Sequence, residues 1–473
     1  MSGARESGVR IRLPGEFFGT PRPSPPAPDN INSPYLQDKA IHFSRDHFFA
    51  KPNLRAAGNA EGRAAIPPGT GGTWHNAFAC SHFNRRDLQM RKSLFAAAIA
   101  LAFASTAHAQ SSVTLYGLIN VGVAYTDNAG GHSQYQMTSS NIYGDRWGLK
   151  GSEDLGSGLK AVFVLENGFA IATGKLSQGG DEFGRQAYVG LSSSQLGTIT
   201  FGRQYDSITD YTYMFEAADS WLPYFGAHPG DLDNMNGTNR INNAIKFSSV
   251  SYDGFTFGGL YSLGGVAGQV SRNQIFSLGA NYSQGPLKVG IAYLNAKDPN
   301  YSFFGDESTS STTGSNMSSS NVYSGYASAR TQQIVVAGAS YTYKASTFGV
   351  VYSNTQFRDI GALAGLPATG AGGNAGFNNV EVNYRYQLTP QLLLGADFDY
   401  LKGYDVNAAK YLQGAIGVDY YLSKRTDLFV DGIYQHASGT DSTGNAAVAN
   451  LNFAGTSTTP NQVMAIVGMQ HRF

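Results

Sequence analysis

From Val113 onward, apolar and polar residues alternate in segments of roughly 8 to 13 residues, the period-two pattern of strands with two different faces. In one segment, Val380, Val382 and Tyr384 alternate with Glu381 and Asn383. A single strand of this kind fits a soluble sandwich as well as a membrane-embedded sheet. The repetition of segments suited to a bilayer crossing of about 9 to 11 tilted residues favours the membrane.

The alternation predicts sixteen antiparallel strands. They span residues 113–125, 145–151, 159–168, 186–192, 198–204, 243–251, 255–264, 274–283, 287–294, 332–344, 347–356, 377–388, 391–403, 410–422, 426–436 and 461–473.

The connections between these strands alternate in length. Tight turns at 152–154, 253–254 and 345–346 contrast with long polar loops around 295–331 and 437–460. Short turns on one rim and long loops on the other are typical of outer-membrane barrels. Because an unpaired sheet edge is costly in hydrocarbon, the sheet must close, and about sixteen strands leave an aqueous lumen. We therefore predict an all-β fold, a transmembrane antiparallel β-barrel.

The first 109 residues differ from the rest. Residues 1–89 hold 10 of the 17 prolines and show no periodic apolar face, so we expect a disordered extension or a mispredicted start ahead of Met90. Residues 90–109 have the basic start, apolar core and small-x-small end of a secretory signal, with cleavage after Ala109. A retained anchor is the alternative, but the apolar core is shorter than a membrane span. The barrel would then occupy residues 110–473.

Composition narrows the function further. Residues 110–473 contain 20 Lys plus Arg and 26 Asp plus Glu, a net charge of −6, and no cysteine, so no disulfide can hold this part together. No metal-ligand spacing, phosphate-binding loop or Gly-x-Ser-x-Gly turn is evident. The histidines there lack Ser/Asp partners at catalytic spacing and are read as loop or girdle residues: His132, His228, His436 and His471. We expect no enzyme, no cofactor and no nucleic-acid partner.

Several motifs, in order, resemble those of a known family. Ser111-Ser112-Val113-Thr114-Leu115-Tyr116-Gly117 opens the series, and Asp145-Arg146-Trp147-Gly148-Leu149-Lys150-Gly151 follows. Arg185-Gln186-Ala187-Tyr188-Val189-Gly190-Leu191, Phe201-Gly202-Arg203-Gln204-Tyr205 and the terminal Phe473 complete it. Together they resemble the general diffusion porins of Gram-negative outer membranes, of the Burkholderia and Neisseria type.

The resemblance implies a homotrimer of sixteen-stranded barrels, each with its own pore and an inward-folded third loop. Its expected function is passive diffusion of ions and small hydrophilic solutes across the outer membrane. Expected partners are outer-membrane lipid or lipopolysaccharide and the barrel assembly machinery. The machinery is expected to read Phe473, which shares one face of the last strand with Val463 and Val467.

The candidate third loop, residues 205–241, combines carboxylates with the apolar stretch Trp221-Leu222-Pro223-Tyr224-Phe225. Its carboxylates are Asp206, Asp210, Glu216, Asp219, Asp231 and Asp233. A solvated surface loop could carry such charges equally well. The apolar stretch favours folding against another surface, because it gains nothing in water. The resemblance places this surface inside the barrel.

Cations of the wall are expected to face this loop. Arg146 alternates with the apolar residues of its strand, as a lumen-facing residue would. The same holds for Arg240 and Lys246, which alternate with Ile241 and Ile245. Arg185 shares parity with outward-facing Ala187 and is assigned to the wall through the resemblance alone. Opposed charges across a narrow aqueous passage would align dipolar solutes and disfavour apolar ones.

Two other functions stay open at this stage. An enzyme on the same barrel would need a catalytic histidine set. An adhesin or receptor would bind partners through its long external loops, for which the Ser/Thr/Asn-rich stretch 308–324 is suited. The sign of ion selectivity is also open, because the net charge and the acidic loop favour cations whereas the arginines resemble those of anion-favouring relatives.

Overall fold

The computed structural model describes residues 111–406 and 408–473. The predicted extension 1–89, the predicted signal 90–109 and its cleavage after Ala109 lie outside the described residues.

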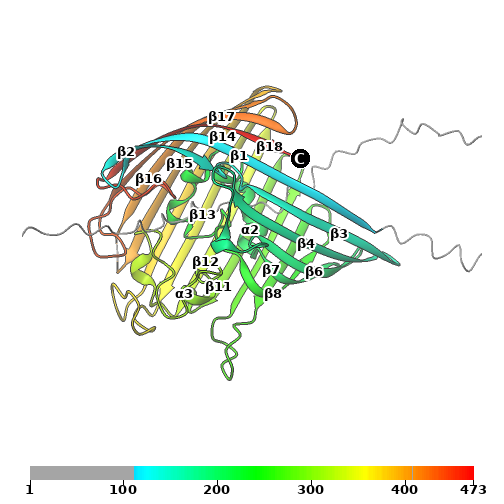
Figure 1. Cartoon of the computed structure of the whole chain (residues 1–473), viewed down its shortest axis with the longest axis horizontal. Coiled ribbons are helices and arrows are strands. Elements are labelled where there is room, and N and C mark those ends of the chain that lie inside the picture. The colour runs from blue at the N-terminus through cyan, green and yellow to red at the C-terminus, as the bar shows by residue number, and fades with distance from the viewer. Residues whose placement is uncertain (1–110, 407) are drawn as a thin grey trace, which may run out of the picture.

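The described chain is almost entirely antiparallel sheet, drawn in Figure 1 as a ring of tilted strands. The first half of the chain forms β1 (Ser112–Ala129), β2 (His132–Ser139), β3 (Arg146–Gly156), β4 (Leu159–Ala170), β5 (Lys175–Leu176), β6 (Gln186–Ser193), β7 (Gly197–Gln204), β8 (Ile241–Ser249) and β9 (Phe255–Ser262). The second half forms β10 (Ile275–Gln284), β11 (Leu287–Lys297), β12 (Thr331–Tyr343), β13 (Ser346–Arg358), β14 (Ala375–Thr389), β15 (Leu392–Asp405), β16 (Lys410–Tyr421), β17 (Thr426–Ser438) and β18 (Asn461–Arg472).

These segments make a closed barrel of sixteen strands, as predicted. β2 and β3 both pair with the same side of β1 and count as one interrupted strand, while β5 is a two-residue pairing beside β4. β18 pairs with the other side of β1, from Leu118 opposite Arg472 to Thr126 opposite Met464. Closure leaves no open edge in the hydrocarbon layer.

The two-residue β5 is missing from the sequence prediction, and so is β2. β2 is polar, yet its alternate residues Tyr135 and Met137 point outward. It pairs with the upper half of β1, with Tyr125 opposite Tyr135. The prediction began this strand at Asp145, and its lower part does begin nearby, at Arg146. A break at 140–145 interrupts the period-two pattern and hides the continuity.

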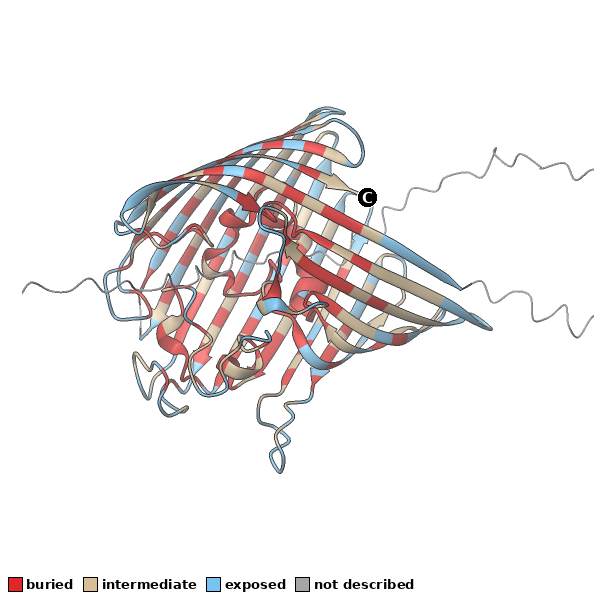
Figure 2. Cartoon of the chain, in the orientation of Figure 1, coloured by how far each residue is buried: buried red, intermediate tan, exposed pale blue. Residues whose placement is uncertain are grey.

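The barrel is apolar outside and polar inside, as the alternation predicts. Figure 2 shows exposed and buried residues taking turns along the strands. On β16, Ile416 is 69% exposed, whereas on β14 and β15 Glu381 and Asp399 are 2% and 1% exposed. Glu381 and Asp399 are thus turned away from the lipid and towards the lumen, which is the reverse of a soluble protein with charged groups on its surface.

The loops also alternate in length. Short turns such as 157–158 and 344–345 lie at one rim, and the long loops 298–330 and 439–460 at the other. The short helix α3 (Pro299–Ser302) and the 3-10 turn Ser324–Tyr326 belong to the first of these long loops, and Gln178–Gly180 is another 3-10 turn.

The third loop comprises residues 205–240, between β7 and β8. It contains α2 (Ser207–Thr212) and four 3-10 turns, Tyr213–Phe215, Ala217–Asp219, Tyr224–Gly226 and Pro229–Asp231. Figure 1 shows α2 within the outline of the strands. Among residues 111–406 and 408–473, no helix is long and apolar enough to cross a bilayer.

Candidate functional site in the barrel lumen

The third loop lies against the inner wall on a track of glycines. Tyr211 and Phe215 occupy the space where side chains would stand at inward positions of four successive strands. These positions are Gly258 on β9, Gly279 on β10, Gly290 on β11 and Gly338 on β12. A Cβ at any of them would overlap the loop. Glycine therefore lets the loop backbone approach the sheet closely.

The loop then continues along the inner wall, past β14, to β15 and β16. Trp221 is 1% exposed and lies flat over Gly395 of β15 and Gly417 of β16. Tyr224 and Phe225 stack on each other with ring centroids 4.3 Å apart. They pack among buried residues of β1, β17 and β18. The apolar stretch of the loop is therefore buried inside the barrel, which explains why the sequence places it in a polar loop.

Three of the predicted wall cations come together on the side of the lumen near β3 and β8. Arg185 contacts Glu166 of β4 at 3.1 Å and donates to the Tyr205 hydroxyl at 3.1 Å. Arg240 donates to the same hydroxyl at 3.3 Å. Burial lowers the pKa of Arg185 to about 10, and the charges of Arg146 and Arg240 act in the same direction. Arg185 stays protonated at neutral pH, so this arginine cluster carries three positive charges.

Glu166 and Tyr205 were missing from the sequence prediction. Glu166 also accepts a hydrogen bond from Tyr116 at 2.9 Å. The sequence shows only that Glu166 alternates with the outward-facing residues of β4. Nothing in the sequence pairs it with Tyr116, which lies fifty positions earlier. Tyr205 is the first residue of the third loop, and its ring lies 5.3 Å from the Arg240 guanidinium. These two residues hold the arginine cluster together.

Lys246 lies apart from the arginine cluster. Its ammonium group is 2.7 Å from the Asp210 carboxylate of α2 and 3.1 Å from the Tyr205 carbonyl. Burial raises the pKa of Asp210, and Lys246 opposes that shift. A polar cavity of about 180 Å³ borders this pair, with Tyr188 and Tyr211 in its lining.

Two of the predicted loop carboxylates stabilise the loop itself. Asp206 caps α2 by accepting from the backbone N–H groups of Ile208 and Thr209, and burial raises its pKa to about 6. Asp231 accepts from the backbone N–H groups of Asn236 and Thr238 at 3.1 Å each. Burial and the charge of Asp233 raise the pKa of Asp231 to about 7.

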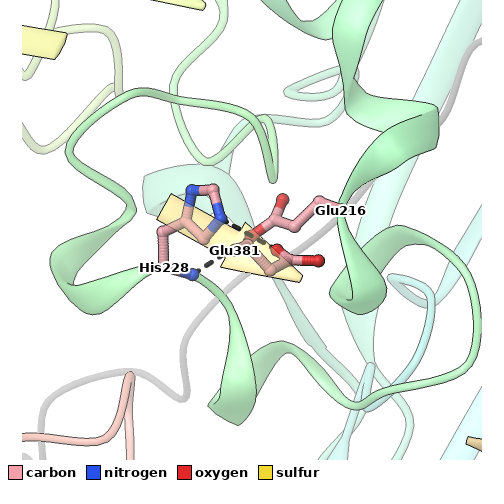
Figure 3. Close-up of side chains that lie close together, drawn as sticks. All are labelled: Glu216, His228 and Glu381. Atoms are coloured by element: carbon pink, nitrogen blue, oxygen red, sulfur yellow. Dashed lines mark hydrogen bonds and ion pairs between the residues drawn. The ribbon is translucent and has the colours of Figure 1, made fainter. Parts of the chain in front are cut away.

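His228 lies in the third loop, one of the two locations that the sequence left open, and is the centre of a buried acidic cluster. Its Nδ1 lies 2.7 Å from Asp233 and its Nε2 lies 2.8 Å from Glu381 of β14. Glu216 accepts from the His228 backbone N–H at 3.1 Å (Figure 3). Asp399 of β15 is 3.8 Å from Nε2. The sequence did not predict this cluster, because Glu381 lies 153 residues after His228 in the chain.

The charged groups in this cluster shift one another's pKa values. Burial alone would lower the pKa of His228, but the carboxylates of Asp233, Glu216 and Asp399 raise it well above its ordinary value. Burial raises the pKa of Glu216, and the charge of His228 opposes the shift. For Asp233, the bond to His228 outweighs burial and lowers the pKa. A cationic imidazole therefore links the third loop to β14.

Asp219 is the remaining predicted carboxylate. Burial and the charges of Asp231 and Glu381 raise its pKa, and Arg146 lowers it. Its backbone carbonyl accepts from the Tyr143 hydroxyl at 3.1 Å, which holds this part of the loop near the break between β2 and β3. Asp219 thus lies within the electrostatic reach of the arginine cluster.

Comparisons with known proteins agree with this architecture. Residues 96–442 match the family model described as Gram-negative porin. The chain is 32% identical over 382 residues to an outer membrane porin protein of Bordetella pertussis, covering 73% of this chain and 94% of that one. It is 30% identical over 355 residues to outer membrane porin protein 32 of Delftia acidovorans, covering 72% and 88%.

Solved structures show the same fold. The anion-selective porin from Comamonas acidovorans superposes with a TM-score of 0.58 at 22% identity, covering 77% of this chain and all of that one. The trimer form of OmpT from Vibrio cholerae gives a TM-score of 0.52 at 14% identity, covering 77% and 99%. With its closed barrel and polar interior, the chain belongs to the Gram-negative porin family and forms an outer-membrane channel for passive diffusion.

Proposed function

We propose that ions and small hydrophilic solutes pass between the arginine cluster and the third loop, and that this passage is the narrowest part of the pore. The observation that carries the proposal is the position of the loop. It is held against β9 to β16 by the glycine track, Trp221 and His228, and so leaves Arg146, Arg185 and Arg240 on the facing wall. The names of the relatives favour a channel over an adhesin or an enzyme.

We further propose that the passage favours anions. The arginine cluster carries three positive charges beside the single charge of Glu166, whereas the cationic His228 offsets Asp233, and burial shifts Asp206 and Asp231 towards their neutral forms. The net field on a solute should therefore be positive. The Comamonas acidovorans porin of similar fold is described as anion-selective, which supports the same sign.

Reversal potentials in a planar bilayer under a KCl gradient test this proposal. We expect the wild-type pore to prefer chloride, and we expect Arg240→Ala and Arg146→Ala each to shift the potential towards cations. Lys402→Ala removes an exposed lysine from the outer face of β15 and should change nothing. Unchanged selectivity and conductance in both lumen variants would show that the passage lies elsewhere.

The proposal extends to the assembly of the protein. We propose a homotrimer in the outer membrane, in contact with lipid or lipopolysaccharide and inserted by the barrel assembly machinery. The trimer form of a structural neighbour supports the first part. The apolar outer surface of the barrel supports contact with lipid.

Phe473 is proposed to be the residue that the assembly machinery reads. It is 49% exposed, and its backbone exchanges hydrogen bonds with Gly117 at 3.1 and 3.0 Å. We expect Phe473→Ala to lower the amount of barrel in the outer membrane of cells but to leave refolding in detergent intact. Met469→Ala, on the same face of β18, serves as the control. Equal losses in cells and in detergent would make Phe473 a purely structural residue.

A further inference from the structure

The acidic cluster around His228 has the donor set of a metal site. One ligand atom from each of Glu216, His228 and Glu381 can be chosen so that all lie within 4.8 Å of one another. Figure 3 shows the two carboxylates on the same side of the imidazole ring. The third loop supplies two of these residues and β14 supplies the third.

A separate observation is that two buried carboxylate oxygens of the cluster have no hydrogen-bond partner. Glu216 is 1% exposed, and its Oε2 atom has no hydrogen-bond partner. Oδ2 of Asp399, also 1% exposed, has none either. Carboxylate oxygens without partners are costly to bury. A cation held beside the His228 imidazole would give the unpartnered oxygen of Glu216 a ligand.

We propose that Glu216, His228 and Glu381 bind a divalent transition-metal ion of the Zn²⁺ class. The ion would replace the proton between His228 Nε2 and Glu381, and it would take up the unpartnered Oε2 of Glu216. Imidazole nitrogen with carboxylate oxygen is a ligand set that Zn²⁺ accepts, whereas Ca²⁺ and Mg²⁺ prefer oxygen alone.

Asp233 fits this arrangement as the positioning residue. It accepts from His228 Nδ1 at 2.7 Å and also contacts the Ser353 hydroxyl of β13. A histidine that binds metal through one nitrogen commonly donates the other N–H to a carboxylate, which fixes the tautomer and the ring orientation. Asp233 thus turns Nε2 towards the carboxylates of the proposed site.

The test measures zinc directly and does not depend on pore activity. Full-length barrel is refolded in detergent with and without Zn²⁺, because the buried ligands would load during folding. Bound metal is then counted by mass spectrometry, and its ligands are examined by X-ray absorption. We expect about one tightly held Zn²⁺ per chain, with a nitrogen and oxygen shell that includes one histidine.

Variants make the result specific. His228→Ala should abolish binding and Glu216→Gln should weaken it at least tenfold. Asp233→Asn should weaken it by about 10- to 100-fold. His436→Ala changes a histidine of β17 outside the cluster and should bind as the wild type does. The shift in gel mobility on heating shows which variants are folded.

Two outcomes would overturn the proposal. One is wild-type barrel that retains no more zinc than folded Glu216→Gln or His228→Ala. The other is equal competition by Ca²⁺ at the same concentration, which would mean attraction to negative charge without a histidine ligand. In either case, a barrel that still conducts normally would leave the proposed function intact.

Discussion

Replacing Gly395 with leucine is expected to dislodge the third loop and raise single-channel conductance. A side chain at this position would occupy the space of the Trp221 indole, which lies over Gly395 and Gly417. Overpacking of this kind typically costs about 1–3 kcal/mol, and the loop can escape that cost by leaving the wall. Bilayer recordings would show larger and noisier openings.

A matched variant separates this effect from a general effect of glycine loss. Gly432 lies on β17, and a Cβ added there would meet no atom within 4 Å. We expect Gly432→Leu to conduct like the wild type. If Gly395→Leu also conducts like the wild type, Trp221 does not hold the loop in place.

Replacing Glu166 with leucine is expected to destabilise the barrel by about 3–5 kcal/mol, the usual cost of removing one partner of a buried ion pair. The change removes the carboxylate that contacts Arg185 at 3.1 Å and accepts from Tyr116 at 2.9 Å. Arg146 and Arg185 would then lose the carboxylate whose charge acts on both of them. Unfolding in denaturant, followed by tryptophan fluorescence, measures the difference.

Glu153→Leu provides the comparison, because Glu153 is exposed on β3. We expect its stability to stay within about 0.5 kcal/mol of the wild type. Equal stability of both variants would mean that water in the lumen, and not Glu166, screens the arginines.

The strands were predictable because the bilayer imposes a rule on them. Each spanning residue must face either lipid or water, so the alternation of Val380 and Val382 with Glu381 gave the orientation of β14 directly. The sequence prediction missed β2 because its outward residues Tyr135 and Met137 have polar neighbours on both sides. Arg185 shares the parity of outward-facing residues of β6, yet its side chain is buried inside the barrel. The strand begins at Gln186, so Arg185 lies before it and does not follow its alternation.

The interior of the barrel was less predictable. The sequence shows that the third loop is both acidic and aromatic, but contacts across the lumen join residues far apart in the chain. His228 meets Glu381 and Trp221 meets Gly395 only once the barrel has closed. The carboxylates of the loop therefore looked alike in the sequence, whereas in the structure Asp206 caps a helix, Asp210 pairs with Lys246 and Asp233 holds a histidine.

The pairing of β1 with β18 makes closure of the barrel a late step in folding. This strand pair places Leu118 opposite Arg472, so the barrel stays open until β18 is in place. Contacts between the two ends of a chain have a high entropic cost and form late. Until then β1 presents an unpaired edge, and a chaperone that shields it during transit would protect the chain from aggregation.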